Sequence, residues 1–229
     1  QTNLLEERYK SHTETRELFS VSSQHYAFVV NAFVSLLKRA DMTRYELFLR
    51  ETRTYEIIED VKNFRSEIGV LFLNGYNRDV LTKMFDDNRL TYTSLFKARP
   101  HIFVSKSNPL AKHKVVSLED LEDFPYLSYD QGIHNSFYYS EEILSQIPHK
   151  KSIVVSDRAT LFNLLIGLDG YTIATGILNS NLNGDNIVSI PLDVDDEIDI
   201  VYLKHEKATL SKMGEKFLDN LVKEVTFDD

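Results

Sequence analysis

The fold is decided by residues 18–40, which read LFSVSSQHYAFVVNAFVSLLKRA. The first five residues have the short, apolar character of a buried strand. From His25 onward, apolar side chains recur every three or four residues, which is the period of a helix that buries one face. Ser22, Ser23 and Gln24 lie between the two patterns. The stretch therefore predicts a strand followed at once by a helix, with small polar side chains where the helix begins.

Ser23 has two interpretations at this helix start. The first backbone N–H groups of a helix lack partners and carry a partial positive charge. A serine hydroxyl there can cap the helix, or it can join the N–H groups in holding a small anion. We take Ser22, Ser23 and Gln24 as candidate ligand-binding residues, with a simple helix cap as the alternative.

Composition excludes several classes of protein. The 229 residues are 42% hydrophobic and 27% charged, which is ordinary for a globular chain. The net charge of −9 disfavours direct contact with nucleic acid, which needs clustered Lys and Arg. Cysteine is absent, so disulfides and thiol chemistry are ruled out. No apolar run approaches the ~20 residues of a membrane span. We expect a cytoplasmic protein without membrane contact.

Strand and helix patterns alternate through the first half of the chain. Residues 45–51 alternate as a strand, and Thr54 is placed to cap a helix. Residues 68–73 (IGVLFL) form a continuous apolar run suited to a central parallel strand. A shorter amphipathic segment follows at 77–87. This alternation predicts crossover units around a parallel sheet.

The pattern then crosses into a second lobe. Residues 90–107 are extended for too long to form one strand, and Pro100 interrupts them. We predict a strand, a hinge at 97–100 and a second strand. The elements expected after the hinge are strands at 126–128, 152–155, 171–175, 187–191 and 198–205, with helices at 135–146, after Asp157 and at 211–225.

The expected architecture is α/β, with two Rossmann-like lobes joined by a two-strand hinge. The first lobe comprises residues 17–96 and 198–229, and the second comprises 97–197. Residues 1–16 are expected to be the end of a helix cut from something longer, or a frayed terminus. Ligands of open α/β sheets bind beyond the carboxyl ends of the strands, which here means the cleft between the lobes.

Several segments resemble the effector-binding domain of LysR-type transcriptional regulators. Residues 108–127 contain N-P-L-A and then V-S-L-E-D-L-E-D-F-P-Y-L, where the family reads H-P-L-A and V-S-L-x-D-L before an apolar strand. Residues 157–175, DRATLFNLLIGLDGYTIAT, resemble the family's helix, G-L-G turn and strand. Residues 56–70 are similar to the family's E-L-L-x-x-L-x-x-G-x-x-D segment. Three residues depart from these patterns: Asn108 replaces His, Glu67 replaces the Asp of that segment, and Asp169 interrupts G-L-G. The Gly before the position of Glu67 is also missing.

The resemblance implies a type 2 periplasmic-binding-protein-like fold that senses a small, anionic effector in its cleft. It also implies that residues 1–16 are the end of a linker helix, and that DNA is bound only through an N-terminal domain this chain lacks. The ligand-binding residues it implies are Ser22, Ser23, Gln24, Phe72, Ser128, Tyr129 and Thr175. For Phe72 and Tyr129 the alternative is core packing. Arg99 and His101 flank the hinge and can pair with an anion, the alternative being an exposed salt bridge.

The resemblance further implies a homodimer, with a tetramer open to the full-length protein. Family members pair side by side and antiparallel, and here the helix at 25–39 would meet the second-lobe helix of the partner, at about 135–147, through Phe137 and Tyr138. The sequence shows no paired histidines of a metal site and no nucleophile elbow or phosphate loop. We therefore expect no enzyme activity, no cofactor and no metal. The alternative function is an extracytoplasmic solute-binding protein of a transporter, whose fold is alike.

Overall fold

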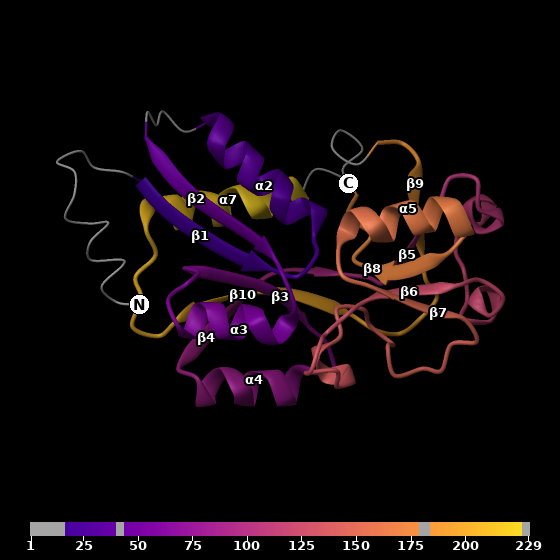
Figure 1. The fold of residues 1–229 in the computed structure, drawn as a ribbon, viewed down its shortest axis with the longest axis horizontal. Helices are drawn as coiled ribbons and strands as arrows, with labels where there is room; N and C mark the ends of the chain where they lie inside the picture. Colours follow the sequence, from indigo (N-terminus) through magenta and orange to yellow (C-terminus); the bar gives the residue numbers. More distant parts are fainter. Residues whose placement is uncertain (1–16, 40–43, 179–183, 226–229) are drawn as a thin grey trace.

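Two five-stranded sheets, one in each lobe, form the framework of the molecule (Figure 1). The computed structural model describes residues 17–39, 44–178 and 184–225. The predicted linker helix at 1–16 lies outside these residues. No helix within the described ranges is long and apolar enough to cross a bilayer.

The first-lobe sheet has the strand order β2-β1-β3-β10-β4. Its strands are β1 (Glu17–Ser23), β2 (Tyr45–Glu51), β3 (Ile68–Leu73), β4 (Leu90–Ala98) and β10 (Ile198–His205). β1 runs parallel to β2 and β3, whereas β10 runs antiparallel to β3 and β4. Every residue of β3 is buried, as the apolar run predicts for a central strand.

The second-lobe sheet has the order β7-β6-β8-β5-β9 and repeats this pattern of directions. Its strands are β5 (His101–Ser105), β6 (Tyr126–Tyr129), β7 (Ser152–Val155), β8 (Tyr171–Ala174) and β9 (Ile187–Pro191). β6 is parallel to β7 and β8, and β5 is antiparallel to β8 and β9. The expected parallel sheets are thus mixed, because the strands that cross between the lobes, β5 and β10, run against the rest.

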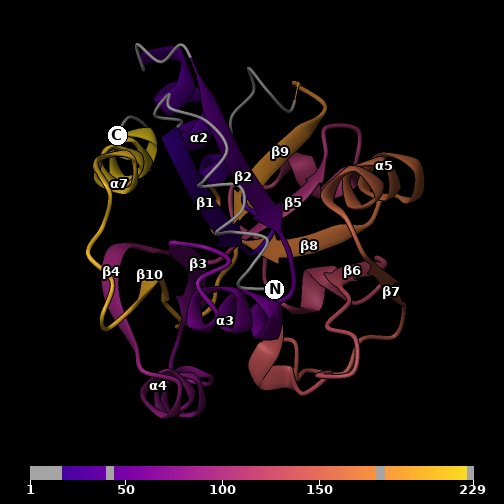
Figure 2. The ribbon, with the colours of Figure 1, turned by 60° about the vertical axis from the view of Figure 1, so that its left-hand side comes forward.

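Helices cover both faces of the first-lobe sheet (Figures 1 and 2). α2 (Ala27–Arg39) and α7 (Lys212–Val225) pack together over one face, where Phe19 contacts both Phe33 and Phe217. α3 (Thr54–Lys62) and α4 (Arg78–Asp87) share a second core with the other face. In the second lobe, α5 (Arg158–Leu168) packs on a third cluster that includes Phe103 and Leu127. The periodic apolar side chains of each helix therefore bury one face, as predicted.

Several local predictions are wrong. Thr54 does not cap a helix, because it is the first residue of α3 and the cap position is occupied by Arg53. Residues 135–146 are not an α-helix, because only the short 3-10 turn η3 (Phe137–Tyr139) forms between the extended residues Ser136 and Ser140. The aromatic side chains of η3 instead stack on the first lobe, with Tyr138 on Tyr76 at 4.8 Å between ring centroids. The remaining short turns of the second lobe are η1 (Pro109–Lys112) and η2 (Glu119–Leu121).

The alternative interpretation of Ser23, a helix cap, is also wrong. Ser22 and Ser23 still belong to strand β1, and the chain turns between Gln24 and Tyr26, whose N–H donates to the Gln24 carbonyl at 2.8 Å. The helix begins only at Ala27, and the buried Ser23 hydroxyl has no hydrogen-bond partner within the part of the chain that the structure describes. Ser23 is therefore a strand residue rather than a cap.

Candidate functional site

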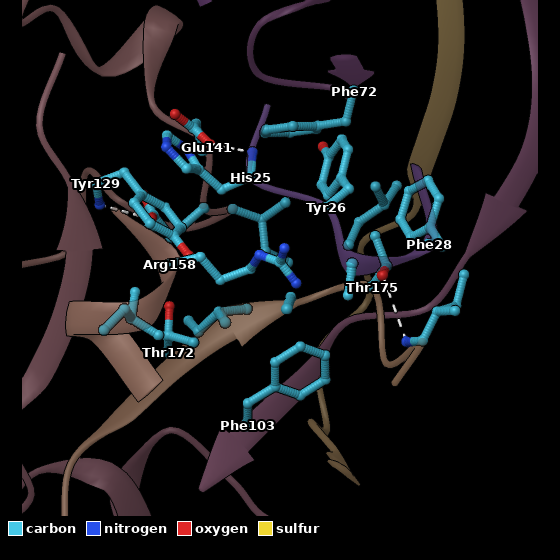
Figure 3. A pocket seen from close by; sticks show the side chains of 18 of the residues that line it. His25, Tyr26, Phe28, Phe72, Phe103, Tyr129, Glu141, Arg158, Thr172 and Thr175 are labelled. Carbon is cyan, nitrogen blue, oxygen red and sulfur yellow. Dashed lines mark hydrogen bonds and ion pairs between the residues drawn. The ribbon is translucent and has the colours of Figure 1, made fainter. Parts of the chain in front are cut away.

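A cavity of about 50 Å³ lies between the two lobes. First-lobe residues reach it from the turn between β1 and α2, from the end of β3 and from the start of β10. Second-lobe residues reach it from β5, β8, the start of α5 and the segment after η3 (Figure 3). Both parallel sets of strands end at this level, so the cavity occupies the place where open α/β sheets bind ligands.

The cavity wall combines four ionisable side chains with an aromatic lining. The ionisable residues are His25, Glu141, Glu142 and Arg158, and the aromatic residues are Tyr26, Phe28, Phe72, Phe103, Tyr129 and Phe162. Thr172, near the start of β8, and Thr175, directly after the strand, add hydroxyl groups. The wall is therefore mainly apolar, with a few convergent polar groups, as in small-molecule sites generally.

His25 joins the two lobes across the cavity. Its Nδ1 lies 2.8 Å from Oε2 of Glu141, which also accepts a hydrogen bond from the His25 backbone N–H at 2.9 Å. The imidazole stacks on Tyr129 at 4.1 Å between ring centroids. Burial lowers the pKa of His25, but the hydrogen bond and negative charge of Glu141, with the charge of Glu51, leave it above the ordinary 6.5. The pair therefore favours a charged imidazole.

Glu142 is the most deeply buried acid of the wall, with 3% of its surface exposed. Its Oε1 accepts a hydrogen bond from the Tyr129 backbone N–H at 2.8 Å. Its Oε2 is buried and has no hydrogen-bond partner among the described residues. Burial, and next the charge of Glu141, raise the pKa of Glu142 well above its ordinary range. Its surroundings therefore favour the neutral form of the carboxyl group.

Arg158 brings a guanidinium group to the same space. It is the first residue of α5, directly after Asp157, whose side chain caps the helix by accepting a hydrogen bond from the Thr160 N–H at 2.8 Å. The Arg158 side chain extends into the middle of the cavity (Figure 3). Its Nε lies 3.1 Å from Oε1 of Glu51, the last residue of β2. This ion pair is a second connection between the lobes.

Of the eight ligand-binding residues predicted from the sequence, Phe72, Tyr129 and Thr175 line the cavity. Ser22, Ser23, Gln24, Arg99 and Ser128 do not form part of its wall. Gln24 supports the wall from behind, because its Oε1 accepts hydrogen bonds from the Tyr26 hydroxyl at 2.6 Å and from the Phe72 N–H at 3.1 Å.

Ser22 and the hinge residues have other partners. The Ser22 hydroxyl donates to Oδ2 of Asp60 at 2.6 Å and lies 2.7 Å from the Ser66 hydroxyl. At the hinge, Nδ1 of His101 lies 2.8 Å from the backbone carbonyl oxygen of Arg99, to which it can donate. The hydrogen-bonding capacity of Ser22 is thus already used inside the first lobe.

Sequence reasoning missed His25, Tyr26, Glu141, Glu142 and Arg158. Arg158 carried a usable signal, since it begins a helix that starts where a parallel strand ends. Glu141 and Glu142 carried none, because a helix was predicted there and would have aimed them differently. Among the described residues, no group of three or more His, Asp or Glu side chains is arranged to hold a metal ion.

Comparisons with known proteins agree with this architecture. Among the similar solved structures is HinK, a LysR family transcriptional regulator from Pseudomonas aeruginosa, with 14% identity and a TM-score of 0.59 over 97% of this chain and 75% of that chain. The effector-binding domain of QuiR in complex with shikimate has 16% identity and a TM-score of 0.59 over 91% of this chain and 97% of that chain. A full-length OxyR variant from Pseudomonas aeruginosa has 11% identity and a TM-score of 0.66 over 98% of this chain and 73% of that chain. These likenesses show the fold. A comparison with curated protein sequences gives no match.

The family itself is shown by a sequence model. The model of the LysR substrate binding domain matches residues 22–226, which is most of the chain. The match covers both lobes and all the segments whose motifs suggested the resemblance. The chain therefore belongs to the LysR substrate-binding domain family, the effector-sensing part of LysR-type transcriptional regulators.

Proposed function

We propose that this domain binds a small molecule with an anionic group in the cavity between its lobes, and that the full-length protein uses this binding to control transcription in the cytoplasm. The observation that carries the proposal is the convergence of Arg158, Tyr129, Thr172 and Thr175 with first-lobe residues on one cavity. A ligand that contacts both lobes has a different affinity for closed and open arrangements, and only such a difference can shift a conformational equilibrium.

The charges around the cavity favour an anion. The wall carries two basic side chains, His25, whose pKa is raised, and Arg158, while burial raises the pKa of the Glu142 carboxyl group and so favours its neutral form. A ligand carboxylate would share the Arg158 guanidinium with Glu51. The hydroxyls of Thr172 and Thr175 would donate to the same group. We propose Phe72, Tyr129 and Thr175 as contact residues, as the sequence suggested.

We further propose that the domain acts by binding and not by catalysis. Its family is that of transcriptional regulators, which also favours this function over a transporter's solute-binding protein.

Calorimetric titration with a panel of carboxylates tests the proposed function. The panel includes shikimate, which the QuiR domain binds, together with small keto, hydroxy, dicarboxylic and amino acids. Replacing Arg158 with Gln should weaken the binding of any active member roughly tenfold or more, since a hydrogen bond to a charged group contributes about 1.5–3 kcal/mol.

The matched control is Lys150→Gln, which removes an exposed cation that pairs with Glu122 away from the cavity. It should leave the affinity unchanged. Absence of binding by every member of the panel, or equal binding by the Arg158→Gln variant, would contradict the proposed function.

A further inference from the structure

The acid Glu142 lines the cavity, and one of its two carboxyl oxygens makes no hydrogen bond to the described residues. Glu142 is 3% exposed, its Oε1 is occupied by the Tyr129 N–H, and its Oε2 has no hydrogen-bond partner among the described residues. Leaving a buried polar atom without a partner is costly. Buried polar groups without partners therefore call for an explanation, and one explanation is a ligand that the cavity is built to receive.

Two ligand groups can satisfy Oε2. A neutral carboxyl group can donate a hydrogen bond to an acceptor such as a carbonyl oxygen. An ionised carboxylate can instead pair with an ammonium group. The aromatic side chains that line the same cavity favour the ammonium group over the hydrogen-bond acceptor. They are Tyr26, Phe28, Phe72 and Tyr129. Aromatic faces attract cations, and desolvated ammonium groups gain most from them.

Resting on the proposed function, we propose that the ligand of this cavity is a zwitterion of the amino-acid class, with its ammonium group on Glu142 and its carboxylate at Arg158. The small size of the cavity, about 50 Å³, agrees with a compact ligand of this kind. His25 is engaged with Glu141, so Glu142 is the acid of the wall that remains for a ligand cation.

The assignment has a consequence for protons. Burial, and next the charge of Glu141, raise the pKa of the Glu142 carboxyl group and favour its protonated form. The other titratable groups that face it are the hydroxyls of Tyr26, Tyr126 and Tyr129. A bound ammonium group stabilises the ionised form. The carboxyl O–H bond then breaks, the electron pair stays on Glu142, and the proton passes to the buffer. A hydrogen-bond acceptor bound at the same place would release no proton.

The experiment is a calorimetric titration of the wild-type domain with the twenty L-α-amino acids. Each one that binds is compared with its N-acetyl derivative, which lacks the cation, and with the amine that lacks its carboxylate. Both analogues should bind roughly tenfold or more weakly. Titrations in two buffers with different ionisation enthalpies, at neutral pH, should show release of up to about one proton per ligand.

Variants locate the effect. Glu142→Gln keeps the size of the side chain and should remove both the proton release and the preference over the N-acetyl derivative. Glu122→Gln, which alters an exposed acid paired with Lys150, should change neither. If Glu142→Gln does not fold, the proposal is still tested by the wild-type domain, through its affinities for the amino acid and the two analogues and through its proton release.

The two proposals fail separately. Equal affinity for an amino acid and its N-acetyl derivative, binding without proton release, or absence of binding by all twenty amino acids at low millimolar concentration would each overturn the zwitterion proposal. Binding of a carboxylate that carries no amine would still support the proposed function. Only the failure of the whole carboxylate panel, or indifference to Arg158→Gln, removes that function.

Discussion

Oε2 of Glu141, in the second lobe, receives two contacts from His25, in the first: the backbone N–H at 2.9 Å and Nδ1 of the imidazole at 2.8 Å. Both side chains are almost fully buried, and the remaining carboxylate oxygen accepts a hydrogen bond from Gln131 at 3.0 Å. One residue at the start of a helix thus connects the lobes through its main chain and its side chain together.

The His25–Glu141 pair should make stability depend on pH. The pKa of folded His25 is raised above 6.5, so its contribution is complete below pH 6.5 and is lost as the pH rises through the raised value. The midpoint of thermal unfolding of wild type should therefore exceed that of His25→Gln most at low pH, and the difference should shrink above pH 6.5. Glu141→Gln should abolish this pH dependence. A difference that stays constant from pH 5.5 to 8.5 would contradict the prediction.

Glu142→Gln should stabilise the ligand-free domain as the pH rises. The pKa of the folded carboxyl group is raised, so its favourable contribution is complete below about pH 4.5 and is lost at higher pH. A pKa difference of one corresponds to about 1.4 kcal/mol, or roughly 3–5 °C in a domain of this size. Melting curves of both proteins from pH 5 to 8 should show the variant gaining relative to wild type. A variant that loses stability relative to wild type over this range would contradict the burial argument.

Ser22→Ala and Ser23→Ala should differ although both residues are fully buried. Ser22→Ala removes the donor to the Asp60 carboxylate, which should lower the free energy of unfolding by about 1.5–3 kcal/mol. Ser23→Ala removes a hydroxyl that has no partner, so the free energy of unfolding should stay the same or rise by up to about 1 kcal/mol. Urea denaturation of the three proteins measures both values. Equal losses would indicate that Ser23 has a partner in solution.

We expect the domain to form a homodimer in solution. Val30, Val34 and Leu37 leave part of the apolar side of α2 uncovered, and Phe137 is 52% exposed. Light scattering at high micromolar concentration should give twice the monomer mass, and Phe137→Ser should shift the equilibrium toward monomer. Val154→Ser is the control, because Val154 is an exposed apolar residue of the β7 strand. A monomer at high micromolar concentration would contradict the expectation.

Periodicity and strand alternation predicted nearly every regular element, because each buries a face whose spacing is visible in the sequence. The segment after Asn135 shows where that reasoning ends. Its apolar residues have a helical spacing, but Tyr138 and Tyr139 find ring partners in Tyr76 and Tyr55 of the other lobe. A contact between residues more than sixty positions apart decided the local conformation, and no local pattern reports such a contact.

The three departures from the family pattern illustrate the same limit. The side-chain amide of Asn108 donates to the backbone carbonyl of Asp169 at 2.7 Å, so two of the departures are in contact. The third, Glu67, accepts hydrogen bonds from the N–H and hydroxyl of Ser211 just before α7. Each unusual residue has a structural partner, which the sequence alone could not identify.

The candidate site was predicted less well than the fold. The strand ends and the cleft followed from topology, which placed Phe72, Tyr129 and Thr175 on the cavity wall. The positions of the charged side chains could not be predicted, because they depend on the direction that a side chain takes after a turn. Hydrophobic spacing carries no information about that direction. Ser23 illustrates the difference, since the strand continued through it and the turn came later.

The stacked rings of Tyr76 and Tyr138 also offer a way to observe the lobes directly. The chain has twelve tyrosines and no tryptophan, so a single Tyr138→Trp substitution would give one spectrally distinct indole. That indole would lie on a ring of the opposite lobe, 4.8 Å away in the present arrangement. Separation of the lobes would expose it to water and shift its fluorescence emission. The contact that formed in place of a predicted helix thus allows the opening and closing of the two lobes to be followed in real time by fluorescence.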